Sequence, residues 1–374
     1  MQLNAAQPGL GASLMLAALA LPAVQPAQAE AVPEHGTVSY KLLDYADSQP
    51  GDPRIKVRAQ SLLISAPVAG PWLATGTATT DAISGASPAY HTSGLGQMHD
   101  HRRALDLSAT RYFQDHTLTL GVNVSSESDY LSRGWSLQGS RFSEDRNTTW
   151  TLGLGVNNDV INPTNHVVDH EQKHVIDLLA SVTQVLGTHD IAQLNLGASI
   201  GRGYFSDPYK VFDNRPRQHD HQTLLARWNH HWDNTGGTAR WSWRYYSDNY
   251  GVHAHTLGLE WVQPLADGWT ITPLARLYTQ SAARFYVPAG EADSPFAPNP
   301  PPDATYTTED QRLSAYGGRT WGLKLARLWA SGWQADLKFE RYAQRGAWRL
   351  FGSGSTGLAP FCARSLQLGV SHPF

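Results

Sequence analysis

The stretch Ala363-Arg-Ser-Leu-Gln-Leu-Gly-Val-Ser-His-Pro-Phe374 decides the fold. Its residues alternate in character: Leu366, Leu368, Val370 and Phe374 fall on one face, and Ser365, Gln367, Gly369 and Ser371 on the other. This period of two predicts a β-strand with one apolar and one polar face. Bacterial outer-membrane barrels end on such an amphipathic strand with a terminal aromatic residue. The alternative is the ordinary last strand of a soluble sandwich.

The same alternation recurs along most of the chain. It predicts strands at 38–45, 54–66, 72–83, 104–113, 118–124, 131–142, around 150–156, and at 173–186, 191–204, 221–232, 238–248, 252–265, 269–286, 312–329 and 333–344. Short connections alternate with mostly longer ones, and outer-membrane barrels have short periplasmic turns and longer outer loops. We therefore predict an all-β fold, a closed antiparallel transmembrane β-barrel of about 16 strands.

The first 29 residues have the pattern of a targeting segment. Leu10–Val24 is a short apolar run, and Ala27-Gln-Ala29 behind it is a small-x-small cleavage site. This arrangement predicts a secretory signal peptide at 1–29, although the Lys or Arg expected before the apolar run is absent. The barrel would then occupy 30–374 as a single domain.

Composition supports a β-protein of the cell envelope. Among 374 residues there are 33 glycines, 13 tryptophans and 15 tyrosines, and only 16% of residues are charged. No run reaches the ~18 apolar residues of a membrane-spanning helix. The single cysteine, Cys362, excludes a disulfide framework or a cysteine-rich metal site. A net charge of −3 provides no basic field, so nucleic acid is not an expected partner.

Charged residues recur on the strand face opposite the apolar one. They are Arg227, Arg240, Arg244, Glu260, Asp336, Lys338 and Glu340. In a soluble sandwich they would lie outside in water, whereas in a closed barrel they line the lumen. The signal peptide, the terminal aromatic residue and the turn asymmetry favour the lumen. We expect the three arginines to form one positive ladder, which the charged residues of 333–344 face across the lumen.

Several stretches carry a family resemblance. They are Ser39-Tyr-Lys-Leu-Leu-Asp-Tyr45, Ile83-Ser-Gly-Ala-Ser-Pro88, Gly201-Arg-Gly-Tyr-Phe-Ser-Asp-Pro-Tyr-Lys210, Asp213-Asn-Arg-Pro-Arg217, Arg227-Trp-Asn-His-His231, Thr256-Leu-Gly-Leu-Glu-Trp261 and Trp348-Arg-Leu-Phe-Gly-Ser-Gly-Ser355. Together they resemble a proteobacterial family of predicted outer-membrane barrels known only as a domain of unknown function. The resemblance implies an envelope location, and genes for a small lipoprotein, a thioredoxin-like protein and a flavin transferase near family members imply an extracytoplasmic redox setting. It implies no catalytic residues.

Histidines recur in H-x-H pairs. The pairs are His99 with His101, His219 with His221, and His253 with His255. Residues i and i+2 of a strand share a face, so each pair presents two imidazoles, which suit Zn, Cu, Fe or Ni. All three pairs fall near the predicted outer rim. The alternative is a set of polar rim residues without a ligand, because closing a metal site would need contacts between loops.

The remaining motifs do not predict catalysis. Ser84 and Ser87 near the rim histidines permit a serine–histidine pair, but no G-x-S-x-G or other known signature orders them. Residues 206–217 lack the residue order of a known calcium loop, which favours a loop folded into the barrel. We therefore predict no enzymatic activity and no cofactor, with a surface enzyme as the least favoured interpretation.

Two functions remain open for a barrel in the outer membrane of a Gram-negative bacterium. One is a channel or conduit for small polar solutes, since about 16 strands enclose a lumen wide enough for water. The other is a scaffold for an extracytoplasmic redox or maturation system. Expected partners are outer-membrane lipid, the barrel-assembly machinery acting on the C-terminal strand, and an envelope lipoprotein or redox protein.

Overall fold

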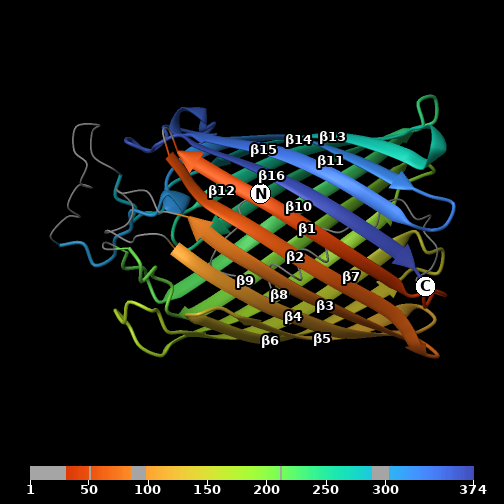
Figure 1. Cartoon of the computed structure of the whole chain (residues 1–374), viewed down its shortest axis with the longest axis horizontal. Helices are drawn as coiled ribbons and strands as arrows, with labels where there is room; N and C mark the ends of the chain where they lie inside the picture. The colour runs from red at the N-terminus through yellow and green to blue at the C-terminus, as the bar shows by residue number, and fades with distance from the viewer. Residues whose placement is uncertain (1–30, 50–51, 86–97, 211–212, 289–302) are drawn as a thin grey trace.

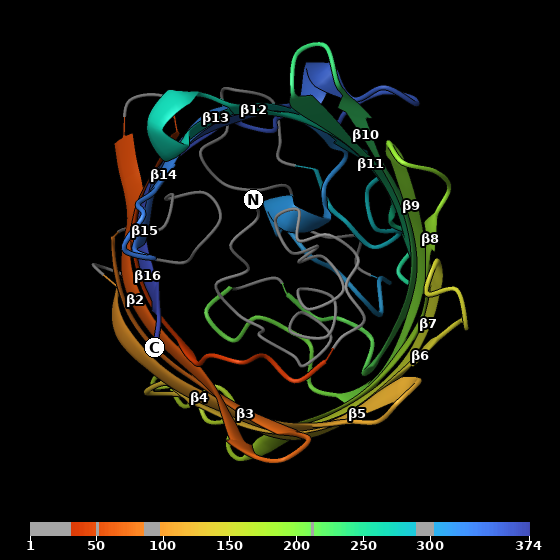
Figure 2. The ribbon, with the colours of Figure 1, turned by 90° about the vertical axis from the view of Figure 1, so that its right-hand side faces the viewer.

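The protein is a closed β-barrel of 16 strands (Figures 1 and 2). The computed structural model describes residues 31–49, 52–85, 98–210, 213–288 and 303–374. The predicted signal peptide at 1–29 and Ser87 lie outside these residues. Among the described residues there is no helix with the length and apolar character needed to span a membrane.

The strands follow one another around the ring. They are β1 (Thr37–Gln49), β2 (Asp52–Ala69), β3 (Trp72–Gly85), β4 (Met98–Tyr112), β5 (His116–Ser126), β6 (Tyr130–Phe142), β7 (Thr148–Ile161), β8 (Glu171–Val185), β9 (Asp190–Gly203), β10 (Gln218–Trp232), β11 (Gly237–Asp248), β12 (His253–Pro264), β13 (Trp269–Gln280), β14 (Tyr316–Leu328), β15 (Gln334–Arg345) and β16 (Phe361–Pro373). Three short 3₁₀ turns accompany them: η1 (Ala266–Gly268), η2 (Gln311–Leu313) and η3 (Gly346–Trp348).

The C-terminal strand closes the ring. Strand β16 pairs antiparallel with β15 on one side and with β1 on the other. Beyond the ladder, Phe374 and Gly36 exchange two backbone hydrogen bonds of 2.9 Å. A Cβ on Gly36 would lie within 3 Å of the Phe374 ring, so the glycine leaves room for the aromatic side chain at this seam. All neighbouring strands are antiparallel, as the alternation predicts.

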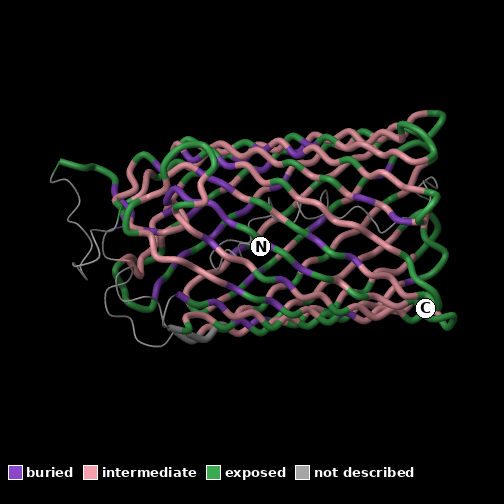
Figure 3. The backbone as a smooth tube through the Cα atoms, turned by 90° about the horizontal axis from the view of Figure 1, so that it is seen from above, coloured by how far each residue is buried: buried purple, intermediate pink, exposed green. Residues whose placement is uncertain are grey.

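Apolar side chains cover the outside of the barrel and polar ones the inside. Exposed and less exposed residues alternate along the strands (Figure 3). The exposed apolar side chains include Leu105, Leu107, Leu118, Leu120, Leu194, Leu196, Leu337, Leu366 and Leu368. In water this surface would be unfavourable, but in lipid it is the expected exterior, because a closed barrel pairs every strand edge. The protein therefore has the architecture of a membrane-spanning β-barrel.

The two ends of the barrel differ. At the long-loop end, two strand boundaries differ from those predicted from the sequence. Short turns and the C-terminus lie at one end, and the longer loops lie at the other (Figure 1). The sequence extended one strand to Tyr286 and began the next at Arg312, but β13 stops at Gln280 and β14 starts at Tyr316. Part of the intervening segment packs instead into a small apolar core in which Tyr250, Val252 and Ala283 are buried. Tertiary packing therefore overrides strand propensity here.

Candidate functional site

The predicted charged residues lie on the inner face of β10–β15. Arg240 on β11 and Glu260 on β12 are direct register partners, and Nη1 of the arginine lies 3.9 Å from Oε2 of the glutamate. Their side chains are 25% and 40% exposed. Arg227 faces Ser242 across β10–β11, and Arg244 faces Thr256 across β11–β12. The arginines are thus diagonal neighbours, and Arg240 pairs with Glu260.

The acidic residues of β15 have cationic partners nearby. Nζ of Lys324 lies 3.8 Å from Oδ2 of Asp336. Glu340 lies 3.9 Å from Arg276 and 3.3 Å from Lys338. Strand β15 is four positions from β11 in a ring of 16, a quarter of the circumference. The expectation that these residues face the arginines across the lumen is therefore wrong: both groups belong to one wall.

This wall carries loose ion pairs. Most separations are near the 4 Å limit of an ion pair, and the basic side chains of β11, β13, β14 and β15 are 24–37% exposed. The pairs of Arg240 with Glu260 and of Lys324 with Asp336 contribute little to stability, because water competes for both charges, whereas the side chain of Glu340 is only 5% exposed. The charges of Arg240, Glu260, Lys324 and Asp336 remain available to a solute or an ion inside the barrel. We call the inward-facing residues Arg227, Arg240, Arg244, Glu260, Arg276, Lys324, Asp336, Lys338 and Glu340 the charged wall.

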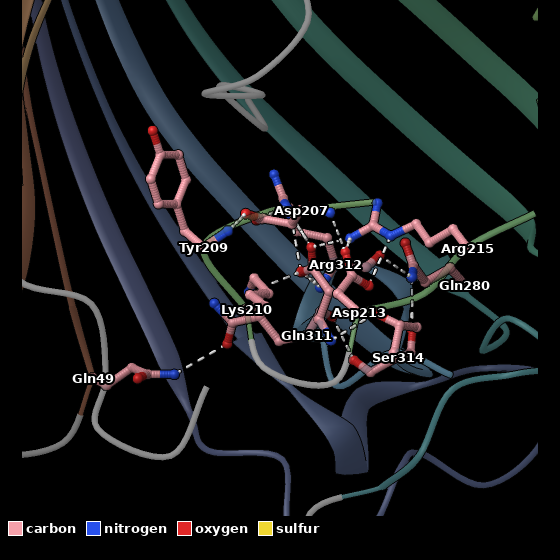
Figure 4. Close-up of polar contacts among 12 residues, drawn as sticks. Gln49, Asp207, Tyr209, Lys210, Asp213, Arg215, Gln280, Gln311, Arg312 and Ser314 are labelled. Atoms are coloured by element: carbon pink, nitrogen blue, oxygen red, sulfur yellow. Dashed lines mark hydrogen bonds and ion pairs between the residues drawn. The ribbon is translucent and has the colours of Figure 1, made fainter. Parts of the chain in front are cut away.

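A second group of charges joins two loops at the long-loop end. The β9–β10 loop (204–217) contributes Asp207, Lys210, Asp213 and Arg215 (Figure 4). The β13–β14 loop (281–315) contributes Arg312, which is labelled in the same view, and Asp310, which pairs with Arg215 and Arg312. We call these six residues the interloop cluster. It contains three acids and three bases, so its formal charge balances. The sequence favoured a folded-in loop at 206–217 but placed Arg312 on a strand, and so missed the partner half.

Asp310 is the centre of the interloop cluster. Its carboxylate is 1% exposed and accepts a hydrogen bond of 2.8 Å from Nη2 of Arg215. Arg312 donates to the same carboxylate through Nε at 2.7 Å and through its backbone N–H at 2.9 Å. Lys210 approaches to 3.8 Å, and Asp207 lies 3.2 Å from Nη2 of Arg312. Backbone bonds between Asn214 and Thr307 add an isolated bridge between the loops.

The joined loops span the mouth of the barrel. On one side, the hydroxyl of Tyr209 donates to Asp129 in the connection between β5 and β6. On the other, Nε2 of Gln49 at the end of β1 donates to Oε1 of Gln311 at 3.1 Å. Gln280 on β13 anchors the loop again through the carbonyl of Ser314. Strands at distant positions around the ring are therefore tied together, and both loops project within the ring in Figure 2.

Two loop carboxyls of this region differ in their pKa values. Burial raises the pKa of Asp310, but Arg312, Lys210 and Arg215 outweigh burial and hold it well below its usual range. Burial raises the pKa of the neighbouring Glu309 to about 7, with Lys210 opposing and Asp213 reinforcing the shift. Asp310 therefore stays ionised at any physiological pH, whereas Glu309 changes its charge near neutrality.

The structure does not bring the three histidine pairs together. His101 and the pair His253 and His255 lie on the outward faces of β4 and β12, whereas His219 and His221 point inward from β10. His219 has a ring centroid 5.7 Å from that of His221 and lies 3.2 Å from Asp248. The side chains of His99 and Ser84 lie outside the described atoms. Within the described residues, the group with metal-ligand spacing is Asp100, Glu127 and Asp129, without a histidine.

A family model matches residues 92–364, well over half of the chain, and is described as "Protein of unknown function (DUF3570)". The chain belongs to this family. No curated protein is similar to it in sequence. The family resemblance drawn from the quoted motifs is thereby confirmed, and the family supplies no activity that could be transferred to this DUF3570 protein.

The fold of this chain is similar to that of solved outer-membrane proteins. The DUF3570 protein is similar to a bacterial polysaccharide outer membrane secretin, with a TM-score of 0.53 and 8% identity over 91% of this chain and 98% of that chain. It is also similar to CdiB from Acinetobacter baumannii, with a TM-score of 0.50 and 10% identity over 89% of this chain and 60% of that chain. At such identities the likeness shows the fold alone, which is that of an outer-membrane barrel.

Proposed function

We propose that the barrel conducts small polar solutes across the outer membrane and that the interloop cluster narrows its outer mouth. The observation that carries the proposal is the partial exposure of the charged wall, where inward-pointing side chains such as Arg240 and Glu260 remain in contact with solvent space. A barrel of 16 strands is wide enough for an aqueous lumen. Loosely paired charges of both signs favour hydrated solutes over apolar ones.

Planar-bilayer recording of the purified, folded protein tests the proposal. We expect small, stepwise ionic conductance, and uptake of small neutral and charged solutes by reconstituted vesicles. Because the joined loops span the mouth, the wild type is recorded beside Asp310→Ala, which removes the centre of the interloop cluster. If both proteins are folded and neither conducts ions or admits solutes, the conduit proposal fails.

The bridge across the mouth also supports a second candidate, a closed barrel that serves as a scaffold for an envelope redox or maturation system. In this case the partner is a lipoprotein or redox protein, and the barrel is not an enzyme. Co-purification from native outer membranes, with flavin and metal analysis of the product, tests this candidate. A stoichiometric partner together with silent bilayers favours the scaffold, and a barrel that purifies alone removes its support.

The C-terminal strand is the proposed contact with the barrel-assembly machinery. Strand β16 completes the ring against β1, and Phe374 packs over Gly36 at the seam. Deleting Phe374 removes the terminal aromatic ring and its backbone pairing, so we expect a marked drop in the amount of heat-modifiable barrel in the outer membrane. Phe351→Ala, which removes an exposed aromatic ring from a loop, is the control. Normal assembly of the truncated protein would contradict this role.

A further inference from the structure

Two arginines face each other on the outside of the barrel. Arg341 on β15 and Arg364 on β16 are direct register partners, and both are exposed. Each shares its strand face with outward leucines, Leu337 on β15 and Leu366 on β16. Like charges directly opposite one another on a sheet are destabilising. Among the described residues, neither arginine forms an ion pair that would offset this repulsion.

Further cations extend this pair along the same surface. Across β1, Ala46 pairs with Arg364 on one side and with Lys56 of β2 on the other, so Lys56 continues the row. Arg58 lies on the same outward face of β2, and Arg319 on that of β14. We call Lys56, Arg58, Arg319, Arg341 and Arg364 the outer basic patch. In the described structure one acid, Asp44, pairs with it, 3.4 Å from Arg58.

The outer basic patch lies where the band of outward-facing apolar side chains ends, on the side toward the long loops. Trp321, Arg341 and Arg364 form one rung across β14–β16, and the next rung toward the short-turn end contains Leu323, Phe339 and Leu366. Leu323 and Leu366 are exposed to the lipid side. Tryptophan and cationic side chains at such a border occupy the headgroup level of a membrane. Because the long loops of outer-membrane barrels face outward, this border belongs to the outer leaflet.

We propose that the outer basic patch binds the phosphate groups of lipopolysaccharide, the anionic lipid of the outer leaflet. Arginine presents a planar fork of donors that matches phosphate oxygens, and such charge-assisted hydrogen bonds are strong. Side chains that face each other on antiparallel strands start about 5 Å apart, close enough for Arg341 and Arg364 to hold one phosphate between them. A bound phosphate also removes the repulsion between the two arginines. The proposal is independent of whether the lumen conducts.

The test compares lipid retention by two variants of the full-length protein. Arg341→Gln combined with Arg364→Gln removes the facing pair, whereas Arg133→Gln removes one exposed outward arginine on β6, whose register partners Val124 and Asn158 are uncharged. Native mass spectrometry of protein from outer membranes counts bound lipopolysaccharide. We expect the affinity of the double variant to fall about tenfold for each arginine–phosphate hydrogen bond that the substitutions remove, and Arg133→Gln to match the wild type.

A second measurement needs no variant. Purified wild-type protein is heated with added lipopolysaccharide or with the same lipid after enzymatic dephosphorylation. We expect only the phosphorylated lipid to raise the unfolding temperature. Equal stabilisation by both lipids, or unchanged lipid retention by a folded double variant, overturns the proposal. If the double variant does not assemble, the comparison of the two lipids decides alone.

Discussion

The charged wall and the interloop cluster use the same chemistry in opposite ways. Both pair Arg or Lys with Asp or Glu. In the wall, Arg240 and Glu260 are 3.9 Å apart and 25% and 40% exposed. In the cluster, Arg215 lies 2.8 Å from Asp310, and their side chains are 13% and 1% exposed. Water therefore weakens the first pair, whereas the second pair has replaced its water with direct hydrogen bonds.

The difference lies in what surrounds each pair. The wall is built on regular strands, whose fixed spacing leaves the side chains opposite one another but not in tight contact. The cluster is built on loops, which can move until donors and acceptors meet. We infer that the wall acts on what enters the barrel, and that the cluster holds the barrel's own loops in place.

Asp310→Ala should have the largest effect. It leaves Arg215, Arg312 and Lys210 without their shared partner, and removing one member of a buried ionic group costs about 3–5 kcal/mol. We expect release of the two loops, higher conductance and faster proteolysis at the long-loop end. The strands should stay intact, which is checked by the heat-modifiable migration of the folded barrel on gels. Asp303→Ala is the matched control, an exposed acid of the same loop. Unchanged proteolysis and conductance would show that the cluster does not hold the mouth.

Leu337→Arg should destabilise the barrel more than Lys338→Leu. Leu337 is 45% exposed on the lipid side, where an arginine near the midplane costs about 2–4 kcal/mol. Lys338 points inward beside Glu340, so its replacement alters the wall without placing a charge in lipid. Urea unfolding in lipid vesicles measures both free energies of unfolding. Equal costs, or the reverse order, would mean that the two faces have been exchanged.

Changing Arg240 and Arg244 together to Ser should shift ion selectivity toward cations while the barrel stays folded. The change removes two positive charges from the wall and frees Glu260 from its 3.9 Å partner. The reversal potential across a salt gradient measures this shift. Arg141→Ser is the control, because Arg141 is 75% exposed on the outward face of β6. If both variants conserve the reversal potential, the wall does not line the conducting path.

Glu309 should make the conductance of the barrel depend on pH through the stability of the loops at its mouth. This is the smallest effect that we expect. Its pKa is raised to about 7 in the folded protein, so the closed loops bind its proton more tightly than the unfolded chain does. Their stability is therefore greatest at acidic pH and falls as pH rises through about 7. We expect conductance to increase between pH 5 and pH 8 and Glu309→Gln to flatten this increase.

Glu127 provides the comparison for that measurement. Burial raises its pKa to about 7 as well, with Asp100 reinforcing and Arg102 opposing the shift, but it lies beside β5, whereas Glu309 lies next to the interloop cluster. Glu127→Gln should leave most of the pH dependence of conductance in place. If Glu127→Gln flattens it and Glu309→Gln does not, the proton acts at the rim and not at the cluster.

The direction of a side chain, inward or outward, was predictable wherever it follows from the position of the residue along a regular strand. Leu366 and Leu368 face lipid and Gln367 faces inward because side chains alternate along any strand, whatever else the chain does. The same rule placed Arg240 and Arg244 on the inner face, opposite Trp241 and Trp243. Alternation says nothing about the direction of a segment that leaves the sheet. For this reason the sequence misassigned 281–286 and 312–315 as strand.

The amino-acid sequence by itself determined the class of fold, the two faces of each strand and the asymmetry of the two ends, because these depend on periodicity and local turn chemistry. Only the tertiary structure decided which charges meet. Asp213 and Asp310 are 97 positions apart in the chain, yet Arg215 binds both. Arg341 and Arg364 face each other because β16 follows β15 in a particular register. Such pairings depend on ring closure and loop packing, which no local pattern records.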